Sequence, residues 1–144
     1  MATRTSLSPK LGDVRVGDCM HHGILSCAAD APLGEVAGVM AHERVHMVAV
    51  TNEGGMRPIG IVSDLDLVAA AASGDEPTAL QAAAGEPLTV SAGASLERAA
   101  QLMTEHGVSH LVVLERSSGY PIGVLSTLDI ASVYAGRPVP TVSK

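Results

Sequence analysis

The sequence has no phenylalanine and no tryptophan, and Tyr120 and Tyr134 are its two tyrosines. Proteins that bind single-stranded nucleic acids stack bases on aromatic side chains, so this scarcity nearly excludes such binding. Positive charge is also scarce: nine Lys and Arg residues stand against fifteen Asp and Glu residues, and the formal net charge is -6. A phosphate backbone requires a basic surface, so nucleic acid is not expected as the main partner.

Long apolar runs are missing as well. The longest one, residues 67–72, is far shorter than the roughly 20 residues that span a bilayer. The first residues, MATRTSLSPKLGD, lack the apolar centre of a signal peptide, and we therefore expect a cytoplasmic protein. The two cysteines, Cys19 and Cys27, make no disulfide framework, and in a reducing compartment both are expected to be free thiols.

The sequence instead contains one pattern twice. Residues 58–66 read PIGIVSDLD and residues 121–129 read PIGVLSTLD, with six of nine positions identical. The two copies align at a constant offset of 63 residues without a gap. We therefore predict a flexible N-terminus at 1–12, a first domain at 13–75, a second domain at 76–138 and a C-terminal tail at 139–144.

Each copy has the same predicted order of elements. Apolar residues recur at i, i+3, i+4 and i+7 in residues 33–40 and 96–103, which is the spacing of an amphipathic helix. Two strand-like runs with a turn between them follow this helix, and a second helical stretch follows the strands. The predicted strands are 45–50, 59–62, 108–114 and 122–125, and the second helices are 65–72 and 128–135. Two copies are too few for a solenoid, so we expect a pseudo-twofold pair.

Both copies end in Ser-x-x-Asp, with Ser63 and Asp66 in the first and Ser126 and Asp129 in the second. Each serine follows a strand and precedes a helix, so it can cap the helix, with the aspartate favourable in the first turn. The same place also suits a ligand, because a helix N-terminus offers free N–H groups to a phosphate. The sequence leaves both interpretations open.

The repeated pattern resembles the CBS domain, and the tandem resembles a Bateman module. The resemblance is carried by GIVSDLD at 60–66 and GVLSTLD at 123–129, with RVHMVAV and GVSHLVVL upstream. It implies an α/β fold of two helix-strand-strand-helix units, related by a pseudo-twofold axis and packed through their short sheets. It also implies two clefts that take an adenosine derivative such as AMP, ADP, ATP or S-adenosylmethionine.

The chemistry of such a ligand points to particular residues. A carboxylate can accept hydrogen bonds from two vicinal hydroxyls, so Asp66 and Asp129 are candidates to bind a ribose, and Ser63 and Ser126 to bind ribose or phosphate oxygens. The resemblance implies that each cleft mixes the two repeats. The cleft of Asp129 and Thr127 then draws on Leu25, Val45, His46 and Met47, and the cleft of Asp66 and Asp64 draws on Leu88, Val108, Ser109 and His110.

The two clefts are not expected to be equal. Asp64 stands where the second copy has Thr127, so the first phrase carries an additional carboxylate beside the expected phosphate path. Like charges repel each other. We therefore predict that the cleft of Asp129 is the better site for an anionic nucleotide.

The leading hypothesis is a regulatory module, not an enzyme, that senses an adenosine-type ligand and signals to an unknown protein partner. The sequence shows no catalytic motif, and no cofactor is expected to be required. The apolar faces of the helices at 67–72 and 96–103 predict a homodimer.

Two other functions remain open. In the first, the chain is a ligand-free dimerisation or scaffold protein in which both Ser-x-x-Asp phrases serve only as helix caps. In the second, it is a metal-responsive regulator that uses Cys19, His21 and His22 of the segment DCMHHG. That segment has no second cluster of ligands at a suitable spacing, so no metal site is predicted.

Overall fold

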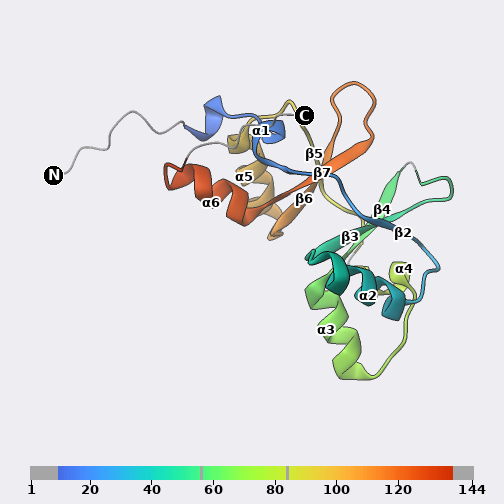
Figure 1. Ribbon diagram of the computed structural model, residues 1–144. Coiled ribbons are helices and arrows are strands. Elements are labelled where there is room, and N and C mark those ends of the chain that lie inside the picture. Colours follow the sequence, from blue (N-terminus) through green and yellow to red (C-terminus); the bar gives the residue numbers. More distant parts are fainter. Residues whose placement is uncertain (1–9, 56, 84, 138–144) are drawn as a thin grey trace. The chain divides into compact units, whose positions relative to one another are not determined.

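The computed structural model describes residues 10–55, 57–83 and 85–137 of the chain. It divides into two compact units, one formed by Ile24–Pro87 and the other by the residues before and after that range. Each unit combines one small sheet with short helices, as Figure 1 shows. The predicted fold class, a mixed α/β pair with two small sheets, is thereby confirmed.

The unit Ile24–Pro87 is built around a three-stranded sheet in the order β2-β3-β4. Strand β2 runs parallel to β3, and β3 runs antiparallel to β4. Its elements are β2 (Ser26–Ala28), α2 (Leu33–Glu43), β3 (Met47–Thr51), β4 (Pro58–Ser63), α3 (Asp64–Ser73) and α4 (Ala79–Ala82).

The second unit is built around a four-stranded sheet in the order β1-β7-β6-β5. Strand β1 is antiparallel to β7, β7 is antiparallel to β6, and β5 is parallel to β6. Its elements are η1 (Leu11–Asp13), α1 (Val16–Cys19), β1 (His21–His22), β5 (Thr89–Ser91), α5 (Leu96–His106), β6 (His110–Leu114), β7 (Pro121–Ser126) and α6 (Thr127–Tyr134). Leu11 and Gly12, which we predicted in the flexible N-terminus, begin η1.

The segment that leads into each repeat packs on the other repeat. At α1 the Val16 N–H donates to the Ala94 carbonyl at 2.8 Å, and at α4 the Ala79 N–H donates to the Ala31 carbonyl at 2.8 Å. These two bonds occupy equivalent positions at the offset of 63 residues. The compact units are therefore offset from the sequence repeats, because the two repeats exchange their leading segments.

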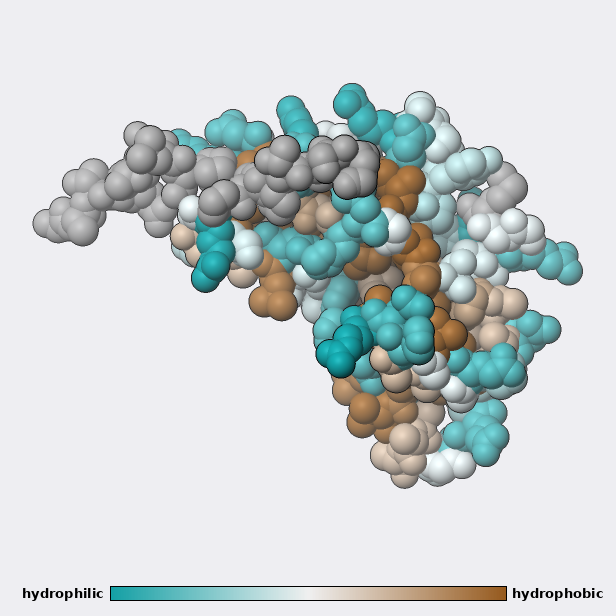
Figure 2. Space-filling model, in the orientation of Figure 1, coloured by the Kyte–Doolittle hydropathy of each residue, from teal (hydrophilic) through white to brown (hydrophobic). Residues whose placement is uncertain are grey.

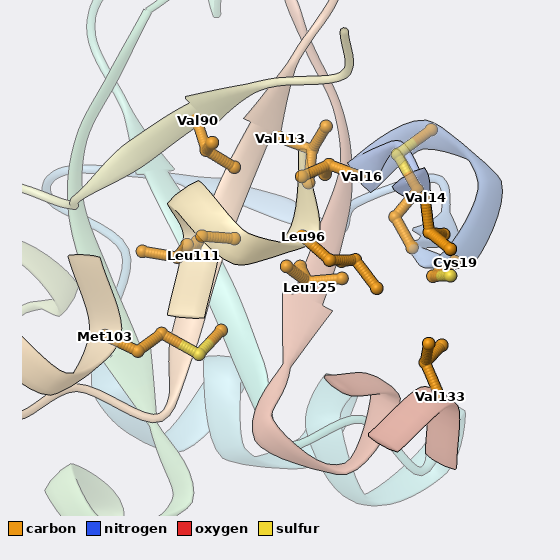
Figure 3. Close-up of a cluster of buried hydrophobic side chains, with 12 residues drawn as sticks. Val14, Val16, Cys19, Val90, Leu96, Met103, Leu111, Val113, Leu125 and Val133 are labelled. Atoms are coloured by element: carbon orange, nitrogen blue, oxygen red, sulfur yellow. The ribbon is translucent and has the colours of Figure 1, made fainter. Parts of the chain in front are cut away.

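The predicted helices at 33–40 and 96–103 form as α2 and α5, and each buries its apolar stripe. Leu33, Val36 and Met40 are buried in one unit, and Leu96, Ala99 and Met103 in the other. Figure 3 shows the second cluster, in which the α5 side chains meet those of β6, β7 and the segment around α1. With no Phe or Trp available, these clusters are made of Val, Leu, Met, Ala and Cys.

Helix α3 leaves apolar side chains in solvent, and Figure 2 shows apolar surface over this helix. Leu65 is 71% exposed and Val68 is 61% exposed. Helix α5, in contrast, buries Leu96, Ala99 and Met103 within its own unit, so this stripe does not supply the apolar face on which we based the predicted homodimer, and the homodimer itself stays a prediction. Within the described ranges, no helix is both long and apolar enough to cross a membrane.

Candidate functional site

The first Ser-x-x-Asp phrase lies where β4 passes into α3. Ser63 is the N-cap of α3, and its hydroxyl oxygen accepts from the Asp66 N–H at 3.3 Å. The Asp66 carboxylate accepts in return from the Ser63 N–H at 2.8 Å and from the Ser63 hydroxyl at 3.0 Å. This reciprocal arrangement is a capping box, which pairs backbone donors that the start of a helix otherwise leaves unpaired.

The second phrase repeats this geometry between β7 and α6. Ser126 accepts from the Asp129 N–H at 3.3 Å, and Asp129 Oδ2 accepts from the Ser126 N–H at 2.8 Å and from its hydroxyl at 3.1 Å. The predicted capping role of both phrases is thus confirmed. Capping uses one carboxylate oxygen, Oδ2, of each aspartate, and leaves Oδ1 for another donor.

The Oδ1 atoms of the two aspartates have different surroundings. Asp129 Oδ1 lies 3.4 Å from His21 Nε2, and the Asp129 side chain is only 11% exposed while that of His21 is 72% exposed. Among the interactions of the described residues, none joins a further donor to Asp66 Oδ1. The His21 contact could not be predicted from the sequence, because the two residues are far apart along the chain and no local pattern links them.

Asp64, the additional carboxylate of the first phrase, is paired with a histidine. His46 Nδ1 lies 2.9 Å from Asp64 Oδ2, and the Asp64 N–H donates to the His46 carbonyl at 3.0 Å. The equivalent backbone bond in the other unit joins the Thr127 N–H to the Ser109 carbonyl at 3.0 Å. When His46 is protonated, it offsets the negative charge of Asp64, so the expected repulsion of a phosphate at this phrase is smaller than the sequence suggested.

The structure places each remaining candidate in the same unit as the Ser-x-x-Asp motif of its own repeat. Met47 is paired with Ser63 across β3 and β4, and His110 is paired with Ser126 across β6 and β7. Leu25, Val45, His46 and Met47 belong to the unit of Asp66, while Leu88, Val108, Ser109 and His110 belong to the unit of Asp129. The assignment of each set to the phrase of the other repeat stays a prediction.

The cysteine and histidine segment does not gather a metal site within residues 10–55, 57–83 and 85–137, where no group of three suitable ligands occurs. Cys19 is buried, while His21 and His22 are exposed. Burial, with the nearby carboxylates of Asp18 and Asp129, raises the pKa of the Cys19 thiol above its ordinary value. A raised pKa disfavours the thiolate, which is the form that binds metals.

Comparison with known proteins identifies the repeat. A family model described as the CBS domain matches residues 16–73 and 83–136. The solved structure of a CBS domain protein from Pyrobaculum aerophilum, complexed with AMP, is 30% identical over 81% of this chain and 89% of that chain, with a TM-score of 0.74. No curated protein matches the chain.

Two further solved structures share the fold at lower identity. One is a CBS domain pair in complex with 5′-methylthioadenosine and S-adenosyl-L-methionine, with a TM-score of 0.76 and 17% identity over 85% of this chain and 97% of that chain. The other is Hypoxic Response Protein I with two coordinated zinc ions, with a TM-score of 0.68 and 23% identity over 82% of this chain and 97% of that chain.

Proposed function

We propose that this chain, which belongs to the CBS domain family, is a regulatory module that binds an adenosine-type ligand and signals to a protein partner. The candidate ligands are AMP, ADP, ATP and S-adenosylmethionine. A ligand with different affinities for two arrangements of the chain shifts the balance between them, and a partner can respond to that shift. The module acts in the cytoplasm, as a homodimer and without catalysis of its own.

The observation that carries this proposal is the relative from Pyrobaculum aerophilum, whose structure contains AMP and whose sequence is 30% identical over most of both chains. The chemistry of the two phrases supports it. Asp66 and Asp129 each keep one carboxylate oxygen beyond the capping box, where a ribose hydroxyl can donate. At the start of each helix the first and third N–H groups already donate within the chain, and the second, at Leu65 and Leu128, is the one that these bonds leave for a phosphate or another acceptor.

The Asp129 phrase remains our proposed site for an anionic nucleotide. Thr127 brings no charge to it, whereas Asp64 brings a carboxylate to the other phrase. The pairing of Asp64 with His46 reduces this difference without removing it, because both side chains are exposed and an exposed pair is weak. Both phrases are therefore candidates, and the Asp129 phrase is expected to bind an anion more tightly.

A scaffold without a ligand is the second candidate function. Two observations favour it: each capping box is complete within the chain, and the apolar side chains of α3 are exposed in a way that suits a partner surface. In this alternative, Asp66 and Asp129 only stabilise the starts of α3 and α6.

A thermal-unfolding screen separates the two candidates. A ligand at one hundred times its Kd stabilises the folded state by about 2.7 kcal/mol, which raises Tm by several degrees in a protein of this size. We expect such a rise with at least one of adenosine, AMP, ADP, ATP and S-adenosylmethionine, and none with guanosine compounds. The double variant Asp66→Asn, Asp129→Asn is the control and should lose the rise. The absence of any shift at millimolar ligand would favour the scaffold.

A further inference from the structure

Asp129 has one carboxylate oxygen available beyond its capping role. Oδ2 accepts from the Ser126 N–H and hydroxyl, and Oδ1 faces His21 Nε2 at 3.4 Å. Because the Asp129 side chain is only 11% exposed, few directions of approach to this carboxylate are open from solvent. A ribose hydroxyl that donates to Oδ1 must therefore approach the same atom that His21 Nε2 already contacts.

The backbone holds His21 in this place. Strand β1 pairs with β7, where His21 is opposite Val124, and the preceding Met20 is buried. Gly123 allows the approach, since a Cβ atom there would overlap the His21 carbonyl oxygen and lie 2.9 Å from Met20 Sδ. The backbone of His21 is thus fixed, whereas its side chain is 72% exposed and can rotate away into solvent.

Among the residues that the structure describes in the other unit, Asp66 has no such contact. At the offset of 63 residues, Ala84 stands in the sequence where the second unit uses His21, and an alanine side chain cannot donate a hydrogen bond. Of the two histidines of that unit, His42 lies beside Glu43 and His46 pairs with Asp64 and not with Asp66. The two candidate ribose-binding aspartates therefore differ. A histidine ring contacts the carboxylate of Asp129, and among the residues that the structure describes none contacts the carboxylate of Asp66.

We infer that His21 is an internal competitor for the ligand, occupying the oxygen of Asp129 to which a ribose hydroxyl donates. This inference rests on the proposed function. Little of the Asp129 carboxylate is open to solvent, so a ribose hydroxyl that reaches Oδ1 displaces the imidazole, and the affinity of this site is lowered by the free energy of that contact. The His21 side chain is 72% exposed and its nitrogen lies 3.4 Å from Oδ1, so the contact is weak: it lowers the affinity by a factor of about two to five and does not block the site.

Adenosine titration in an Asp66→Asn background tests the inference, because this background reports the Asp129 site alone. Adenosine carries no phosphate, so the measurement follows the ribose and the base. We expect His21→Ala to tighten binding by about twofold to fivefold, the range for a weak ion pair. His22→Ala is the matched control, since His22 is the exposed neighbour on β1, and it should leave the affinity unchanged. Unfolding curves verify that each variant is folded.

The same substitution in an Asp129→Asn background is the second control. With Asp129→Asn in place of Asp66→Asn, only the other site remains, and His21→Ala should leave adenosine binding unchanged. An unchanged or weaker affinity of His21→Ala in the Asp66→Asn background overturns the competitor role, and a weaker affinity assigns His21 to the ligand instead. If adenosine, AMP and S-adenosylmethionine bind to neither the parent nor any variant, the proposed function itself fails. The two failures are thus distinguished.

Discussion

The backbone carbonyl of His21 lies where a Cβ atom on Gly123 would project. In the other unit, a Cβ atom on Gly60 would come within 2.9 Å of the Ala83 Cβ. Both glycines belong to the repeated Pro-Ile-Gly phrase, and both lie under the segment that leads into the other repeat. The glycine of each phrase is therefore explained by the exchange of leading segments, which need a close approach to β7 and to β4.

Alanine at these two positions should be destabilising to different degrees. We expect Gly123→Ala to lower the free energy of unfolding by about 1 to 3 kcal/mol, because the obstacle is backbone that cannot rotate away. Gly60→Ala should cost less, since a Cβ atom there lies farther from its nearest obstacle, the Ala83 Cβ at 2.9 Å, than a Cβ atom on Gly123 lies from the His21 carbonyl oxygen. Gly34→Ala is the control: a Cβ atom there meets nothing within 4 Å, and alanine favours the α2 helix. Urea unfolding measures all three, and equal losses at Gly123 and Gly60 would contradict this account.

The loop between β6 and β7 should respond to acid. Hydrogen bonds from Ser118, and then from Ser117, lower the pKa of Glu115 from 4.5 to about 2. A lowered pKa in the folded state means that the carboxylate stabilises the loop above pH 4.5, and that this contribution is lost as the pH falls towards 2. We expect the Ser118 amide, which donates to Glu115 at 2.7 Å, to lose protection from hydrogen exchange over that range.

The first repeat supplies a control for the loop. There Asn52 occupies the position of Glu115, and its side chain accepts from the Arg57 N–H at 3.0 Å. An amide side chain does not titrate, so the protection of the Arg57 amide should not change in step with that of Ser118. Glu115→Gln should remove the acid response of the second loop, and a response that persists in this variant would assign it to another group.

Helix α3 should form a homodimer contact. Leu65 and Val68 are more than half exposed on it, and burying such side chains is favourable by about 1.5 to 3 kcal/mol each. We expect sedimentation at micromolar concentration to show a dimer, and Leu65→Glu to shift it towards the monomer. Tyr120→Ser, in the loop between β6 and β7, removes a half-exposed apolar group elsewhere and should not change the association. A parent protein that sediments only as a 14.6 kDa species would rule the dimer out.

Much of the local structure could be predicted because the sequence repeats it. The stripe at Leu96 and Met103 and the serine caps are local patterns, and each occurs twice at one offset. The exchange of leading segments could not be predicted in this way. Val16 bonds to Ala94 of the second repeat, but a bond to Ala31, the equivalent residue of its own repeat, would agree equally well with a constant offset of 63 residues. The offset therefore does not say on which repeat a leading segment packs.

In the candidate site, too, the local features could be predicted from the sequence and the contacts between distant segments could not. The capping geometry of Ser126 and Asp129 follows from four neighbouring residues, and it was predicted from them. The pairs between His21 and Asp129 and between His46 and Asp64 join distant segments, and they depend on strand pairing that brings the two residues together. Histidines have no apolar periodicity to mark such contacts, so the sequence pointed to His21 only as a candidate metal ligand.

Replacing Asp129 by asparagine separates a ligand site from a helix cap. Asparagine keeps an oxygen that can accept from the Ser126 N–H, so the capping box is largely retained and the loss is that of a charge at the N-terminus of α6. We expect the free energy of unfolding without ligand to fall by at most about 1 kcal/mol. If Asp129 binds a ribose, the same change should weaken adenosyl-ligand binding by about 1.5 to 3 kcal/mol, the range for hydrogen bonds to a charged group.

Asp66→Asn is the internal control for this measurement, because Asp66 has the same capping geometry in the other unit. Its effect on AMP and ATP should be smaller, since Asp64 makes that site less favourable for an anion, while its effect on adenosine should be comparable. Calorimetric titration of both variants, with their unfolding curves, measures binding and capping separately. A ligand that binds the parent protein and binds Asp129→Asn with the same affinity would remove Asp129 from the site and leave it the role of a cap alone.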